Sequence, residues 1–293
     1  MLKKKILMFV FTCILTLTVL SVDLDYWALQ APYGTGACSR GSLSVYTNPA
    51  ALILQTKWEA NFLSTIWQQS EDNAYKIFGV NVIQPFQNGF AGSIDILYGD
   101  LIDPSSDDRY ASFGYSIAGK LNDLAWGARI VAGRFDKKED DDAYYGSANF
   151  GLMYNVAEHT RIMVNTNAPQ IVTSNATLFE KNRPESFWVG GGLMSSTEDA
   201  RAYLSLQGYR KDEQALMSAN FGGGFKISFI NFDMSLSFMD FEKDQELANV
   251  KTYGNGMVLF DFKDFRVGLS ASIPLHGVSL SETKYSFFVS ARW

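Results

Sequence analysis

The sequence has few of the residues that build disulfides and metal sites: 293 residues include two cysteines and two histidines. Cys13 lies in an apolar N-terminal stretch that we expect to be removed, so only Cys38 remains and no intramolecular disulfide can form. The two histidines lie in separate turn-like segments, and no group of residues has the spacing of a zinc site. We therefore expect neither a metal nor a cofactor.

Positive charge and long apolar runs are also scarce. The net charge is −6 and no basic stripe is present, which argues against a nucleic-acid partner. After residue 20 no apolar run reaches the roughly 18 residues that a transmembrane helix needs. The mean hydropathy of −0.05 fits a soluble protein, and it fits equally a barrel in which lipid-facing and lumen-facing residues alternate.

The N-terminus has the three parts of a secretory signal. Lys3, Lys4 and Lys5 form a basic group, residues 6–20 form an apolar core, and Ser21 is a small residue at a plausible cleavage position. This pattern predicts a signal peptide over residues 1–21. Small residues are lacking before Cys13, which disfavours a lipid anchor.

Alternating apolar and polar residues recur along the chain from residue 57 onward. The pattern is clearest from Phe265 to Ile273, where every second side chain is apolar and those between are polar or glycine. A period of two is the signature of a strand with one apolar face. Fourteen such segments are found, at residues 58–67, 75–84, 89–98, 110–119, 124–135, 144–155, 160–167, 187–194, 201–210, 215–228, 232–241, 251–262, 265–273 and 284–293. The sequence therefore predicts an all-β fold, a transmembrane antiparallel β-barrel of about 14 strands over residues 57–293.

The last of these segments carries apolar or aromatic side chains on one face and mostly polar ones on the other. It resembles the closing strand of bacterial outer-membrane barrels, whose assembly machinery recognises a C-terminal aromatic strand. The alternative is the last strand of a soluble sheet, but the strand count favours a barrel. We thus expect outer-membrane lipid and the barrel-assembly machinery as partners. The expected assembly signal consists of Tyr285, Phe287, Val289 and Trp293.

The connections between the strands include two acidic segments, residues 100–108 and 136–142. Both lack the glycine and the final glutamate of an EF-hand loop, so solvated loop charge is favoured over calcium binding. The longest gap, residues 168–186, is interpreted as an outward loop that folds over the mouth of the barrel.

The segment between the signal and the first strand begins with glycines and serines and then contains a helix start. Asn48 is a favourable N-cap, Pro49 suits the first helical position, and Ala50 to Leu54 continue the helix. A short capped helix ahead of a barrel is explained if it lies inside the lumen. Residues 22–56 are therefore predicted to be an N-terminal hatch, or plug, with a periplasmic tail as the alternative.

These residues carry a family resemblance. A glycine-rich run with Arg40-Gly41 that leads to Asn48-Pro49-Ala50 resembles the start of the long-chain fatty acid transporter superfamily of outer-membrane proteins. Its relatives include the shuttle protein of the type IX secretion system. The resemblance implies a 14-stranded barrel with its N-terminal segment folded into the lumen as a hatch. The residues expected to form the hatch or the ligand-binding pocket beside it are Arg40, Gly41, Leu43, Val45, Tyr46, Asn48, Pro49, Ala50 and Leu52.

The first functional hypothesis is an outer-membrane channel for hydrophobic small molecules, gated by the plug, with plug rearrangement or a lateral gap as the route. The alternative is a non-transporting envelope protein that binds a protein partner, as in the secretion-shuttle branch. A polar porin is a third hypothesis, against which a plug would count. A hydrolase is disfavoured because His159 and His276 are both expected in turns. The glycine triplets 190–192 and 222–224 lack a following Lys-Ser/Thr, so they are interpreted as strand bends or close backbone approaches rather than phosphate loops.

Overall fold

The structure is a computed structural model that describes Cys38 and residues 44–68, 74–102, 109–137, 140–172, 187–211, 214–241, 250–277 and 283–293. The predicted signal peptide, Arg40, Gly41, Leu43 and most of the predicted mouth loop at 168–186 lie outside these residues.

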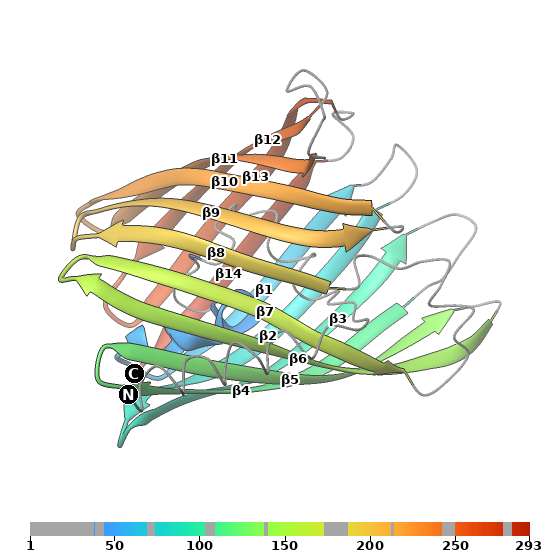
Figure 1. Cartoon of the computed structure of the whole chain (residues 1–293), viewed down its shortest axis with the longest axis horizontal. Helices are drawn as coiled ribbons and strands as arrows, with labels where there is room; N and C mark the ends of the chain where they lie inside the picture. Colours follow the sequence, from blue (N-terminus) through green and yellow to red (C-terminus); the bar gives the residue numbers. More distant parts are fainter. Residues whose placement is uncertain are drawn as a thin grey trace.

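Fourteen antiparallel strands form a closed barrel, in which each strand pairs with its sequence neighbours and β14 pairs with β1 (Figure 1). This confirms the predicted all-β, 14-stranded antiparallel barrel. The strands are β1 (Glu59–Gln68), β2 (Ala74–Gln87), β3 (Phe90–Ile102), β4 (Arg109–Leu121), β5 (Leu124–Lys137), β6 (Asp140–Ala157), β7 (Thr160–Val172), β8 (Phe187–Ser196), β9 (Ala200–Lys211), β10 (Gln214–Ile227), β11 (Ile230–Phe241), β12 (Lys251–Asp261), β13 (Phe265–His276) and β14 (Lys284–Arg292).

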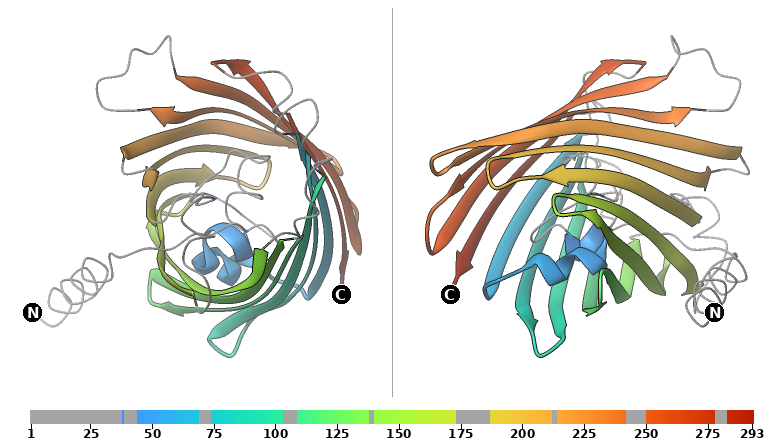
Figure 2. Two further views of the ribbon diagram at one scale, coloured as in Figure 1. Left: turned by 90° about the vertical axis from the view of Figure 1, so that its right-hand side faces the viewer. Right: turned by 60° about the vertical axis from the view of Figure 1, so that its left-hand side comes forward.

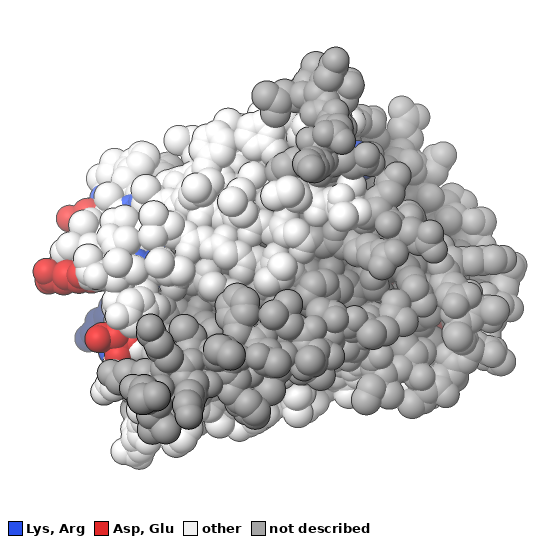
Figure 3. Space-filling model, viewed as in Figure 1, with Lys and Arg blue, Asp and Glu red and all other residues white. Residues whose placement is uncertain are grey.

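The barrel buries polar side chains and exposes apolar ones. On β3, Ile94 and Ile96 point outward with 49% and 55% of their surface exposed, whereas Ser93 and Asp95 point into the lumen and are buried. Among the residues coloured in Figure 3, charged side chains gather at the left-hand end of the barrel, and the white surface beside them is uncharged. An apolar outer band around a polar interior is the arrangement that a barrel needs in lipid.

The strands are joined by short turns at the end of the barrel from which β1 starts. The six connections β2–β3, β4–β5, β6–β7, β8–β9, β10–β11 and β12–β13 span only two or three residues each. In the first of these, Asn88 and Gly89 both have positive φ angles, of 52° and 89°, as a tight hairpin turn requires. We call this end the short-turn end.

Two predicted loops are shorter than expected. The acidic segment 136–142 was expected as a loop, but β5 runs to Lys137 and β6 begins at Asp140, with these two residues paired. Likewise β7 continues to Val172, five residues beyond the predicted strand 160–167. The backbone ladder of an antiparallel hairpin continues past the apolar band because its hydrogen bonds do not depend on side-chain polarity.

Two short helical segments precede β1: α3 (Ser44–Thr47) and the 3₁₀ helix η3 (Pro49–Leu54). They lie within the ring of strands, closer to β2–β6 than to the opposite wall (Figure 2). In the described part of the chain, no helix has the length and apolar character to cross a membrane.

A network of charged side chains closes the seam between the first and last strands. The carboxylate of Glu59 accepts hydrogen bonds from Gln55, at 2.5 Å, and from Arg266 of β13, at 3.2 Å. Arg266 also contacts Asp261 of β12 at 3.3 Å, and Asp261 in turn pairs with Arg292 of β14. Glu59 is almost fully buried, so its side chain meets these partners in place of water.

We predict that Glu59→Ala lowers the free energy of unfolding by about 3 kcal/mol, because it removes one of the two carboxylates that pair with the largely buried Arg266 and leaves Gln55 without its acceptor. The matched control is Asp100→Ala, which removes a 3.6 Å ion pair to Arg109 whose side chains are 44% and 59% exposed. That change is expected to cost less than about 1 kcal/mol. Urea unfolding in detergent micelles, followed by the gel mobility of unheated samples, measures both. Equal effects of the two substitutions would contradict the seam network.

Candidate functional site in the barrel lumen

The site is built around the Asn48-Pro49-Ala50 segment, which starts η3. Asn48 has extended backbone angles, and its side-chain oxygen accepts a hydrogen bond from the Ala50 N–H at 3.2 Å. Pro49 occupies the first helical position, where no N–H partner is needed. The capped helix predicted at Asn48 is thus confirmed, as a 3₁₀ helix rather than an α-helix. All four residues from Pro49 to Leu52 are buried.

This segment fits into a notch made by two glycines of the barrel wall. Gly127 of β5 and Gly151 of β6 are directly paired across the two strands. A Cβ atom on Gly127 would lie 2.4 Å from the backbone nitrogen of Ala50, and one on Gly151 would lie 2.0 Å from the Asn48 side-chain oxygen. Such approaches are far inside van der Waals contact, so the backbone of the segment lies against the wall only because both wall residues lack side chains.

Tyr46 of α3 covers a buried ion pair on the same wall. Arg129 of β5 forms two hydrogen bonds with Asp95 of β3, of 2.6 and 3.2 Å, and both side chains are fully buried. The guanidinium carbon of Arg129 lies 5.1 Å from the centre of the Tyr46 ring, a cation–π contact. The Tyr46 hydroxyl accepts a hydrogen bond from Asn81 of β2 at 3.2 Å. Tyr46 therefore joins the helical segment to the charged and polar groups of three strands.

Two further contacts hold the segment to β7–β9. The side-chain amide of Asn165 donates to the backbone oxygen of Thr47 at 2.6 Å. Further along the wall, the Cys38 thiol donates to the Leu204 backbone oxygen at 3.7 Å and occupies the space above Gly192, where a Cβ would lie 2.5 Å from the sulfur. Burial raises the pKa of the Cys38 thiol to about 12, an effect that the nearby Arg201 partly opposes.

The structure brings together six of the nine predicted hatch residues. Val45, Tyr46 and Leu52 belong to one buried cluster, which includes Leu63 and Leu97 of the wall. Ala50 belongs to a second cluster, and Asn48 and Pro49 are also buried. The wall residues that receive them, above all the glycine notch and the ion pair under Tyr46, were missed by the sequence reasoning. The close approach that the sequence assigned to the first glycine triplet is observed at Gly192.

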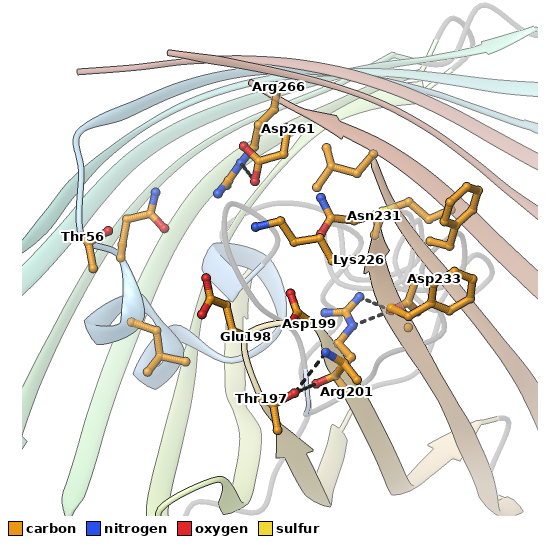
Figure 4. Close-up of a pocket in the computed structure, with 18 of the residues that line it drawn as sticks. Thr56, Thr197, Glu198, Asp199, Arg201, Lys226, Asn231, Asp233, Asp261 and Arg266 are labelled. Atoms are coloured by element: carbon orange, nitrogen blue, oxygen red, sulfur yellow. Dashed lines mark hydrogen bonds and ion pairs between the residues drawn. The ribbon is translucent and has the colours of Figure 1, made fainter. Parts of the chain in front are cut away.

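A cavity of about 380 Å³ lies beside this segment, at the short-turn end (Figure 4). Residues 54–57, which lead from η3 to β1, form one side, and strands β9–β14 form the other. Its lining includes five acidic and five basic side chains, and the apolar residues Leu54, Met257, Leu259 and Phe288. Within the described ranges, no group of three or more His, Cys, Asp and Glu residues is placed to hold a metal ion.

The closed 14-stranded barrel matches the fold of solved FadL- and TodX-type outer-membrane channels. The TodX monoaromatic hydrocarbon channel (deltaS2 mutant) superposes with a TM-score of 0.61 at 13% identity, covering 92% of this chain and 99% of that one. A Pseudomonas aeruginosa FadL homologue gives 0.60 at 9% identity, covering 91% and 97%. The Pseudomonas putida toluene transporter TodX gives 0.59 at 12% identity, covering 90% and 97%.

The likeness is one of fold, because these identities are low. No protein-family model matches the sequence, and no curated protein matches it.

We predict that Gly127→Ala unseats the helical segment, because the new methyl group would overlap the Ala50 backbone. The readout is alkylation of Cys38 at pH 8 in a Cys13→Ala background. With a thiol pKa near 12, almost no thiolate is present at pH 8 while the segment is seated, and alkylation becomes faster only as the pH rises toward that value. Unseating exposes the thiol, lowers its pKa toward 9.0 and raises the alkylation rate at least tenfold.

The control is Gly99→Ala, also on a lumen-facing position, where the nearest atom to the new methyl group lies at 3.5 Å. Alkylation should stay slow in this variant. If Gly127→Ala were as unreactive as the parent, the notch would not hold the segment.

Proposed function

We propose that the protein is an outer-membrane channel for hydrophobic small molecules and that its N-terminal segment is the lumen plug that gates it. The observation that carries the proposal is the fit of Asn48-Pro49-Ala50 into the Gly127–Gly151 notch. Two paired wall positions are glycine at the place where the segment packs, and this fit indicates a specific closure rather than a chance contact. The fold likeness to a toluene transporter and a hydrocarbon channel supports the substrate class.

The location and orientation follow from the barrel surface. An apolar outer band requires lipid, and closed barrels of this kind are typical of the bacterial outer membrane. Because periplasmic turns of such barrels are short, we assign the short-turn end to the periplasm. The opposite end of the barrel then faces outward, and Asn48-Pro49-Ala50 closes the lumen between the two ends.

The plug is held by individually weak contacts that could be broken when the plug moves. Tyr46 contributes one cation–π contact and accepts one hydrogen bond, and Asn165 contributes one hydrogen bond to the Thr47 backbone. Each polar contact is worth about 1–2 kcal/mol at most, and burial of the Val45 and Leu52 side chains adds about 1.5–3 kcal/mol each. Ligand binding energy would have to offset these contributions to shift the plug. Among the predicted hatch residues, Val45, Tyr46 and Leu52 are therefore the ones we assign to holding the plug closed.

A second candidate is a non-transporting envelope protein that binds a protein partner, as the sequence also suggested. The charged lining of the cavity favours it, because a hydrocarbon gains nothing from ten ionisable side chains. Mass spectrometry of the intact protein from its own membranes separates the two: a stoichiometric hydrophobic molecule supports the channel, and a co-purifying protein without one supports the partner-binding role.

The direct test is uptake of labelled oleate and of toluene by cells that produce the protein and lack other channels for these compounds. Tyr46→Ala removes the contacts with Arg129 and Asn81, and we predict a several-fold faster uptake than in the parent. Tyr154→Ala is the control, since that side chain is exposed on the outer face. Uptake no faster than in cells without the protein, for parent and Tyr46→Ala alike, would contradict the channel.

We also assign the apolar face of β14, with Tyr285, Phe287, Val289 and Trp293, to recognition by the barrel-assembly machinery. Tyr285, Phe287 and Trp293 are exposed on the outside of the barrel. Trp293 also stacks on Trp58 at 6.4 Å between ring centres. A loss of assembled barrel could therefore reflect recognition or the stack.

Trp293→Ala is predicted to lower the amount of assembled barrel in the membrane at least threefold. Trp58→Ala abolishes the same stack without altering β14, and it should leave the amount nearly unchanged. Quantification of the folded, heat-modifiable band in membrane fractions measures both. Equal losses would assign the effect to the stack instead of to recognition.

A further inference from the structure

The cavity at the short-turn end has a chemistry that hydrocarbon transport does not use. Its acidic residues are Glu59, Glu198, Asp199, Asp233 and Asp261, and its basic residues are Lys57, Arg201, Lys226, Arg266 and Arg292. The numbers of the two charges are equal, so the cavity attracts neither anions nor cations as a class. Its acidic and basic side chains lie at different positions around a small, partly enclosed space.

The three arginines of the cavity are committed to neighbouring carboxylates. Arg201 pairs with Asp233, which also accepts a hydrogen bond from Tyr203 at 2.9 Å. Arg266 and Arg292 belong to the seam network with Glu59 and Asp261. These side chains are mostly buried, with exposures of 17%, 23% and 11% for the arginines. They form fixed walls and are not available to a ligand without breaking a pair.

Four charged residues of the cavity remain, and one of them, Lys57, donates a hydrogen bond to the Lys263 backbone oxygen at 3.2 Å. Within the described ranges, no ion pair is observed for Lys226, Glu198 or Asp199. Lys226 lies near the end of β10, while Glu198 and Asp199 lie in the β8–β9 turn, which the Lys226 N–H joins through the Asp199 backbone oxygen at 2.7 Å. Figure 4 shows the side chains of Lys226 and Glu198 extending into the same space from these two elements.

A polar donor beside Lys226 is also unused. Asn231 of β11 is the paired neighbour of Lys226, and its side-chain nitrogen is shielded from solvent without a hydrogen-bond acceptor among the described residues. A buried donor without an acceptor costs free energy, so a ligand acceptor at this place would be stabilised. Lys226 and Asn231 together form a donor pair suited to a carboxylate.

We propose that this cavity binds a small zwitterionic solute of the amino-acid type, at a site separate from the plug seat. The carboxylate of the solute is held by Lys226 and Asn231, and its ammonium group is held by Glu198 and Asp199. A volume of about 380 Å³ accommodates a molecule of this size. The site faces the short-turn end, so the solute enters from that side without passing the plug, and the proposal does not depend on the hydrophobic cargo.

The test compares ligands that carry one or both charges. The probes are 4-aminobutanoate, butanoate and butylammonium, with glycine and 6-aminohexanoate to vary the charge separation. Binding to the full mature chain in detergent is measured by saturation-transfer NMR and by calorimetric titration. We expect at least one zwitterion to bind tenfold or more tightly than butanoate and butylammonium.

Two variants assign the charges. Lys226→Met should weaken zwitterion binding at least tenfold. The control Lys76→Met changes an exposed lysine on β2, far from the short-turn end, and should leave binding unchanged. Glu198→Gln should weaken the zwitterion and leave butanoate unaffected. Unchanged gel mobility of unheated samples verifies that each barrel remains folded.

Three outcomes would overturn the proposal. One is that no probe binds at a concentration of about 10 mM, at which even a weak site with a millimolar dissociation constant would be occupied. Another is butanoate binding as tightly as the zwitterion, which would indicate a simple anion site. The third is zwitterion binding that survives Lys226→Met.

Discussion

The closed hydrogen-bond ring of the barrel is the constraint from which the rest of the structure follows. In lipid, an unpaired backbone N–H or C=O costs several kcal/mol, so a sheet can cross only if its first and last strands pair. Here β1 pairs with β14 along nine residues, from Glu59 with Arg292 to Trp67 with Lys284. The seam is reinforced on the lumen side by the Glu59 network and at its end by the Trp58–Trp293 stack. Once the ring is closed, the outer face must be apolar, and the polar side chains of every strand are left to the lumen.

A polar lumen creates a second requirement, which is how to hold the helical segment inside it. The chain meets this requirement in two ways. Apolar residues such as Val45 and Leu52 pack on the few apolar wall positions, and two polar wall residues, Asn81 and Asn165, donate hydrogen bonds to the segment. Arg129 and Asp95 neutralise each other beneath Tyr46, and Asn165 donates to the Thr47 backbone. The Gly127–Gly151 notch then sets the depth at which the segment sits. Gln55, the C-cap of η3, donates a hydrogen bond to Glu59, so the helical segment is joined directly to the seam network.

The fold could be predicted from the sequence because its signal is local. Alternation such as that in Phe265–Ile273 reports a strand within a few residues, and the number of such segments sets the number of strands. The N-cap at Asn48 followed by Pro49 is also a local signal, and the structure confirms it as the start of η3. Strand ends were less certain, since charged residues such as Lys137 and Asp140 continue a ladder that their side chains do not favour.

The wall residues of the site could not be predicted from the sequence, because they are brought together by long-range strand pairing and not by a local pattern. Gly127 and Gly151 are 24 positions apart, and Asp95 and Arg129 are 34 apart, so only the register of the strands brings each pair together. Nothing in the sequence distinguishes Gly127 from the other glycines of the chain. The cavity depends in the same way on long-range pairing, because Glu198, Lys226 and Asn231 come from three elements. The segment seated in the lumen could therefore be anticipated, but the seat itself could not.

The central claim is that the N-terminal segment closes the lumen, and single-channel conductance in planar lipid bilayers tests it most directly. The comparison is between the mature protein and a form that lacks residues 34–54, with the folded state of both verified by gel mobility. If the segment closes the lumen, the mature protein has a small or absent conductance and the deletion form a steady, much larger one. A deletion form that conducts no better than the mature protein would contradict this claim.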